Sequence, residues 1–191
     1  MERLYVKVCD TLLVMSIVIL TLSFSVLAAS TKTIYDIQLG KSDTAHNILD
    51  YVNGVADLQV ELTDAEREHL EDVRLIFRHI KLLFAAALAS TCLLLRSQSE
   101  KAAAIRLAGT LLMGICVLLG LAAISFSLTF NMFHEIFFAP ETYTFPEDSL
   151  LIQNFPYTYF FHSYMAILLT ILLAGISTAL LAYKYRRKKS L

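Results

Sequence analysis

The sequence predicts an all-α integral membrane protein with four transmembrane helices and a small extracellular α+β cap. Hydrophobic residues occupy 57% of the 191 positions and charged residues only 17%, and the mean hydropathy is +0.60. The runs 11–29, 107–130 and 163–183 contain no charged residue, and each is long enough to cross the hydrocarbon core of a bilayer as a helix. This composition excludes an ordinary soluble domain.

The first transmembrane helix is expected within residues 1–30. Small residues at its end, Ala28 to Ser30, also fit a cleaved signal peptide, but the apolar run is longer than a usual signal core. We therefore expect a retained helix.

The second span is less evident, because 82–95 is uncharged but too short to cross a bilayer alone. Apolar residues at helical spacing extend it towards the N-terminus. They are Leu75, Ile76, Phe77 and Ile80. Arg78 and Lys81 then lie at the interface with their side chains reaching outwards. The pattern favours a transmembrane helix over 74–96, with a re-entrant segment as the alternative.

Basic residues set the predicted orientation. The start of the chain, the turn 97–106 and the tail of 163–191 carry Lys and Arg. In contrast, 31–72 holds ten Asp and Glu against three Lys and Arg, and 133–162 holds four acidic residues and no Lys or Arg. We therefore expect both termini in the cytoplasm, and the connections 31–73 and 131–162 outside, on either side of the third span, 107–130.

The first outer connection, 31–73, is long enough to fold as a cap. Apolar and polar residues alternate in 35–39 and in 58–62, which predicts two short strands. Between them, Ser42 can begin a helix that ends just before Gly54.

His69 lies in a helix that Thr63 and Glu66 open with the spacing of a capping box, and this helix is expected to continue into the second span. Imidazole has an ordinary pKa near physiological pH. Asp72 follows three positions later on the same helix face, where its carboxylate can bond one ring nitrogen and make the other more basic. The alternative is a solvated helix end, since charged residues surround His69 in the sequence.

His134 follows the third span and precedes a glutamate. A zinc-protease motif would need a second histidine four positions later, where this chain has Phe138, so that class is excluded. Neither a metal site nor a cofactor is expected. Taken alone, His134 and His162 also fit ordinary interfacial residues, and His46 and His79 are expected at the surface and the interface.

The connection 131–162 is rich in aromatic residues. An interfacial aromatic belt is the ordinary explanation, but a belt usually marks both faces of the membrane. The concentration on one side favours an apolar pocket or lid. Its candidate substrate-binding residues are Phe133, Phe137, Phe138, Tyr143, Phe155, Tyr159 and Phe160.

Four segments together resemble the lipoprotein intramolecular transacylase (Lit) family of Gram-positive bacteria. They are 51–54 (YVNG), 68–73 (EHLEDV), 133–138 (FHEIFF) and 148–160, from Asp148 through Asn154-Phe-Pro156 to Phe160. Their order and spacing match over nearly the whole chain. The stretch 138–150 departs from the family in having no tryptophan.

The resemblance implies a membrane acyltransferase with catalytic residues His69 and His134 at the outer face of a bacterial cell membrane. It implies that the sn-2 acyl chain of a diacylglyceryl lipoprotein moves to the α-amino group of its N-terminal cysteine, which gives a lyso-lipoprotein. Its partners are then lipoproteins and membrane lipid, not nucleic acid. Asp72 is the candidate supporting residue. The sequence does not decide which histidine is the base. The alternative function is a non-enzymatic four-span scaffold or accessory protein.

Overall fold

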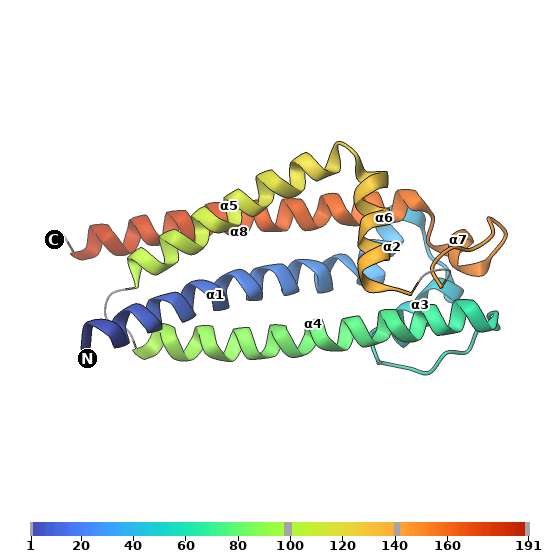
Figure 1. The fold of residues 1–191 in the computed structure, drawn as a ribbon, viewed down its shortest axis with the longest axis horizontal. Helices are drawn as coiled ribbons and strands as arrows, with labels where there is room; N and C mark the ends of the chain where they lie inside the picture. Colours follow the sequence, from blue (N-terminus) through green and yellow to red (C-terminus); the bar gives the residue numbers. More distant parts are fainter. Residues whose placement is uncertain (1, 98–100, 140–141, 190–191) are drawn as a thin grey trace. The chain divides into compact units, whose positions relative to one another are not determined.

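The computed structural model describes residues 2–97, 101–139 and 142–189, and these form eight helices and no strand (Figure 1). The helices are α1 (Glu2–Ala29), α2 (Lys32–Leu39), α3 (Asp43–Val52), α4 (Asp64–Ser97), α5 (Ala102–Ala123), α6 (Phe126–Phe137), α7 (Leu150–Asn154) and α8 (Tyr157–Lys189). The predicted helical class is confirmed for this part of the chain.

Four helices in the described residues are long and apolar enough to cross a membrane. Their candidate spans are Tyr5–Ala29, Asp64–Arg96, Ala102–Ala123 and Tyr157–Tyr185. This confirms the predicted number of spans. α4 runs unbroken through 74–96, so the chain does not turn back there as a re-entrant segment would.

The chain divides into two compact units. Unit 1 comprises Met1–Val26, Lys81–Gly120 and Ile167–Leu191, and unit 2 comprises Leu27–Ile80 and Leu121–Ala166. Each of the four long helices contributes residues to both units.

Unit 1 has a core made by its helices α1, α5 and α8. Leu13, Leu112 and Ile171 are fully buried there, one on each helix, and Leu94 and Leu95 of α4 pack against the same cluster. Many of the remaining apolar side chains on these helices are exposed. Helices that are apolar on all sides are typical of membrane spans, whose outer faces contact lipid.

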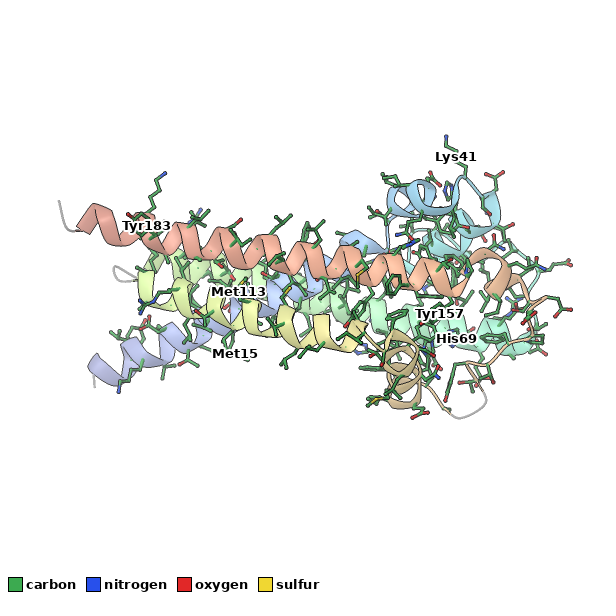
Figure 2. All side chains as sticks on the ribbon, turned by 90° about the horizontal axis from the view of Figure 1, so that it is seen from above. Met15, Lys41, His69, Met113, Tyr157 and Tyr183 are labelled. Carbon is green, nitrogen blue, oxygen red and sulfur yellow. The ribbon has the colours of Figure 1, made fainter. Side chains whose placement is uncertain are left out.

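Two glycines let α5 and α8 approach closely inside unit 1. A Cβ atom added at Gly109 would lie 2.6 Å from Thr178 Oγ1 and 3.2 Å from the carbonyl oxygen of Gly175. One added at Gly175 would lie 2.9 Å from the sulfur of Met113, which is labelled on α5 in Figure 2. Small residues commonly permit such close helix contacts in membranes.

Unit 2 has a separate core that joins α2, α3, α7 and the first turns of α4 and α8. Its buried residues are Tyr35, Ala45, Ile48, Leu49, Tyr51, Val52, Leu70, Leu151, Phe155 and Tyr159. The Tyr35 hydroxyl donates to the backbone oxygen of Asn154 at 2.9 Å, and the Ser42 hydroxyl donates to its side-chain oxygen at 2.8 Å. Asn154, at the end of α7, is therefore tied to both α2 and α3.

The two predicted strands are wrong, so this region is not an α+β cap. Residues 35–39 belong to α2, whose first turn is capped by the Thr31 hydroxyl and which ends at Gly40 with a φ of 83°. The alternation misled because Ile37 points outwards and is 75% exposed. Residues 58–62 are irregular, and the Asn47 side chain binds this stretch by accepting from the Gln59 N–H at 2.8 Å.

The predicted helix starts in this region are confirmed. The Ser42 hydroxyl accepts from the Ala45 N–H at the start of α3, and Gly54 follows the end of that helix with a φ of 67°. The capping box of α4 is formed as well, because Glu66 accepts from the Thr63 N–H at 3.0 Å and returns its own N–H to the Thr63 hydroxyl at 3.3 Å.

The apolar run 107–130 is two helices rather than one. α5 and α6 are separated by a break in which Ser125 has a φ of −122° and a ψ of 58°. The Thr129 hydroxyl donates to the Ala122 carbonyl at 2.9 Å. The same carbonyl also accepts from the Ser125 N–H at 3.3 Å, so it stays bonded where the helical hydrogen-bond pattern of α5 ends. Much of the predicted connection 131–162 is likewise helical, in α6, α7 and the start of α8.

Candidate active site

His69 is placed by the second turn of α4, within unit 2 (Figure 2). Five charged residues follow His69 on α4 before the uncharged stretch 82–95 begins. They are Glu71, Asp72, Arg74, Arg78 and Lys81. This polar end of the helix, 64–73, therefore lies outside its apolar segment, which begins near Leu75.

His134 is placed by α6, also within unit 2. Its Nδ1 atom lies 2.7 Å from the carbonyl oxygen of Phe130, one turn earlier on the same helix. A carbonyl oxygen can only accept, so Nδ1 carries the proton. Neutral His134 therefore keeps an unprotonated Nε2, whose lone pair can take up a proton.

The structure brings the two histidines together. Their ring centroids are 6.2 Å apart and their planes differ by 16°, which is a stacked arrangement. Phe138 contacts both rings, with centroid distances of 4.6 Å to His69 and 5.3 Å to His134. This phenyl ring is 7% exposed. One buried aromatic side chain thus restricts the positions of both imidazoles.

Further aromatic rings surround the pair. Phe145 lies 5.4 Å from His69 between ring centroids. Phe130 lies 4.2 Å and Tyr143 5.4 Å from His134. The histidines are therefore set in a largely apolar environment contributed by α6 and by the connection that follows it.

This environment favours uncharged imidazoles. Burial lowers the pKa of His134, and its bond to the Phe130 carbonyl offsets part of that effect. Burial also lowers the pKa of His69, the nearby His134 lowers it further, and Asp72 acts in the opposite direction, which leaves a pKa of about 4. Both rings are consequently neutral at physiological pH.

Asp72 does not make the hydrogen bond that the sequence led us to expect. The buried Nδ1 atom of His69 has no hydrogen-bond partner among the described residues. Asp72 influences His69 only through its charge, which favours the protonated ring. The tautomer of His69 is thus not set by Asp72.

The predicted substrate-binding aromatics separate into two groups. Phe133, Phe138 and Tyr143 contact His134, with ring centroids 5.3 to 5.5 Å from it. Phe155 and Tyr159 instead lie in the core of unit 2.

The last two predicted aromatics take intermediate positions. Phe160 bridges the two groups, because its ring contacts both Phe130 and Tyr159. Phe137 is 54% exposed and packs on Phe133. The substrate pocket itself stays a prediction.

The other three histidines lie apart from this pair. His46 is not a free surface residue, because its Nε2 lies 2.6 Å from Asp36 Oδ1. His79 is exposed and its Nδ1 bonds the Leu75 carbonyl of its own helix. His162 is exposed at the start of α8.

Three residues near the site, Phe130, Phe145 and Leu151, are not among the candidate site residues predicted from the sequence. Phe130 could have been found, since it lies four positions before His134 on a helix and so on the same face. Phe145 contacts His69, and the Leu151 N–H donates to Glu66 Oε1 at 3.1 Å. Both contacts depend on how the chain around α7 packs on α4, which no local sequence pattern predicts. Among the described residues, no group of three or more His, Cys, Asp or Glu side chains lies together so as to hold a metal ion.

The family model for the lipoprotein intramolecular transacylase Lit matches residues 11–160. The chain belongs to the Lit family. Lit-family membership makes it a lipoprotein intramolecular transacylase, an acyltransferase, and decides against the non-enzymatic scaffold. The search of curated proteins gave no match.

Solved Lit structures share this fold. The membrane-integral Lit from Bacillus cereus is 20% identical, with a TM-score of 0.86 over 96% of this chain and 97% of that one. Variants of the same protein with one histidine replaced by arginine or by alanine each give a TM-score of 0.78 over 99% of this chain and 97% of theirs, at 21% and 20% identity. Together with the four apolar helices, this likeness identifies a multi-pass membrane protein.

Proposed function

We propose that this Lit-family enzyme moves the sn-2 acyl chain of a diacylglyceryl lipoprotein to the α-amino group of its N-terminal cysteine. The observation that carries the proposal is the pair of neutral, stacked histidines, one with an open Nε2. In the reaction the amine nitrogen bonds to the ester carbonyl carbon, and the bond from that carbon to the glyceryl oxygen breaks. The amine proton ends on the glyceryl oxygen, so no co-reactant is needed.

The substrate's own connectivity explains why an enzyme is required. Attack within one molecule closes a ring through N, Cα, Cβ, S, two glyceryl carbons, the ester oxygen and the carbonyl carbon, which is eight-membered. Medium-sized rings close poorly in a flexible chain. An apolar site that holds both ends in contact converts lost conformational freedom into rate.

We assign the general base to His134. The amine must lose a proton to attack, and its unperturbed pKa is about 8. Nε2 of His134 is the free acceptor, since Nδ1 is engaged with Phe130. The stacked ring of His69 stabilises the oxygen that leaves the glycerol. Phe133, Phe138 and Tyr143 are proposed to contact the acyl chain and the glyceryl group.

The decisive test is conversion of a diacylglyceryl lipopeptide by purified enzyme in detergent, without phospholipid. The product should keep the substrate's mass and change its fragment ions in tandem mass spectrometry. An N-acetylated lipopeptide should be inert because it has no nucleophile. If isotope-labelled phospholipid is added and the label appears in the N-acyl chain, the transfer is intermolecular and the proposal is wrong.

Substitution of the histidines tests their assigned roles. His69→Ala and His134→Ala should each abolish conversion in protein that still inserts into the membrane. His79→Ala is the matched control, because this exposed histidine lies on α4 and bonds only its own helix backbone. Substantial conversion by either of the first two variants would remove that residue from the mechanism.

We also propose that both termini are cytoplasmic and that the histidines act at the outer face, on the strength of the basic turns and acidic connections. In a background without Cys9, Cys92 and Cys116, a cysteine at the exposed Lys41 should react with a membrane-impermeant thiol reagent in intact cells (Figure 2). One at Ser99, which lies outside the described residues, should not. The reverse labelling pattern would invert the orientation.

A further inference from the structure

Glu66 is a buried carboxylate close to the proposed catalytic pair. Its side chain is 2% exposed. The ion pairs among the described residues are Lys32–Asp50 and His46–Asp36, and neither pair includes the Glu66 carboxylate. A buried charge without a cation is costly unless hydrogen bonds satisfy it. What satisfies this carboxylate therefore indicates what it does.

The two carboxylate oxygens of Glu66 bond to different parts of unit 2. Oε2 accepts from the N–H of Thr63 at 3.0 Å and from its hydroxyl at 2.9 Å. Oε1 accepts from the N–H of Leu151 at 3.1 Å. The first set begins α4, whereas the second bond reaches the first turn of α7, 85 residues away in the sequence.

These bonds also keep the carboxylate charged. Burial alone would raise the pKa of Glu66, but hydrogen bonds from the backbone of Thr63, Leu151 and Leu150 and from the Thr63 hydroxyl outweigh it, so the pKa is lowered. Glu66 is thus ionised at physiological pH and accepts from both elements at once.

Both elements joined by Glu66 lead directly to the histidines. His69 lies three residues after Glu66 on α4, so it is on the same face of the helix. The chain that enters α7 carries Phe145, in contact with His69, and Tyr143, in contact with His134. A shift of α7 relative to this turn of α4 would therefore move aromatic rings that restrict both imidazoles.

We propose that Glu66 is a positioning residue for the transacylase reaction. Its carboxylate binds the start of α7 to the start of α4 and so holds the rings of Phe145 and Tyr143 against the two histidines. It touches no reacting atom. The inference rests on the proposed function only in using turnover of the lipopeptide as one of its two measurements.

Glu66→Gln tests the inference, because an amide keeps one acceptor oxygen and cannot serve both Thr63 and Leu151. For folded enzyme, kcat should fall by about 10- to 100-fold with a smaller change in KM. Hydrogen–deuterium exchange should become faster in the peptide covering 142–151 while the rest of unit 2 keeps its protection. If Glu66→Gln protein cannot be purified, Glu66→Asp serves instead, since it keeps the charge but is too short to bridge.

Asp64→Asn is the matched control. Asp64 is an exposed carboxylate in the first turn of the same helix, so its loss should leave kcat and exchange as in the wild type. A kcat for Glu66→Gln within about twofold of the wild type per folded molecule would overturn the inference. Unchanged exchange over 142–151 in Glu66→Gln would also overturn the inference. The exchange measurement does not depend on turnover. If the wild-type enzyme itself fails to convert the lipopeptide, that result counts only against the proposed function.

Discussion

Among the side chains of the site that carry no titratable group, Phe138 is the one whose removal should damage the site most. It is 7% exposed and contacts His69, His134, Phe133 and Tyr143. Truncating a buried phenylalanine to alanine costs about 3 to 5 kcal/mol of stability. The void also lets water reach both imidazoles and leaves them free to turn, and misplacement of catalytic groups by about 1 Å can lower kcat about 100-fold.

Phe137→Ala is the natural comparison for Phe138→Ala. Phe137 is the adjacent residue and has the same chemistry, but it is 54% exposed and packs on Phe133 rather than on a histidine. Its truncation should cost about 0.5 kcal/mol, as for ordinary surface positions, and should leave kcat close to the wild-type value.

The two variants should be compared as purified proteins in the same detergent. Thermal unfolding gives the loss of stability, and tandem mass spectrometry of the lipopeptide gives kcat per folded molecule at a temperature where all variants are folded. Wild-type kcat in Phe138→Ala would refute the idea that this ring holds the histidines. An equal loss in Phe137→Ala would show that any apolar loss in this region has the same effect.

Three further outcomes follow from other contacts. Gly109→Ala should lower stability by about 1 to 3 kcal/mol, because the added Cβ meets Thr178 at 2.6 Å. Gly114→Ala, with nothing within 4 Å of the added Cβ, should unfold at the wild-type temperature, and equal unfolding temperatures for the two variants would contradict the close packing. Asp72→Asn should keep activity within about tenfold of the wild type, because no hydrogen bond is lost, and should lower the pKa of His69 in a ring NMR titration; complete inactivity would restore a direct role for the carboxylate. The protein should lose stability as pH falls from about 6.5 to about 4, because His69 in the unfolded chain binds a proton that the folded protein excludes. The loss of stability should be smaller in His69→Ala, and an equal loss would assign the pH dependence to other groups.

Patterns that depend on neighbouring residues were correctly predicted from the sequence. The four long apolar helices, the Ser42 cap of α3 and the capping box of Thr63 with Glu66 all follow from charge and spacing within one turn or one span. The two histidines are 65 positions apart in the sequence, and their pairing could be inferred only through the resemblance to the Lit family.

The failures have physical causes that lie outside local patterns. Alternation in 35–39 suggested a strand, yet the Thr31 cap, the stop at Gly40 and the burial of Tyr35 select a helix. The run 107–130 contains no proline, and its break is stabilised by the Thr129 hydroxyl rather than by a helix-breaking residue. Asp72 has the right spacing for a bond to His69, but spacing alone does not orient a side chain.

The bond from His134 Nδ1 to the Phe130 carbonyl has a consequence for how protons travel. A ring with both nitrogens open can pass a proton from one side to the other, whereas His134 exchanges protons through Nε2 alone. In the proposed reaction, the proton removed from the amine must therefore depart from the atom that received it. This is no obstacle, because the amine nitrogen and the departing glyceryl oxygen are attached to the same carbon in the tetrahedral intermediate. One stationary nitrogen can receive the proton from the first and deliver it to the second, so the ring need never turn.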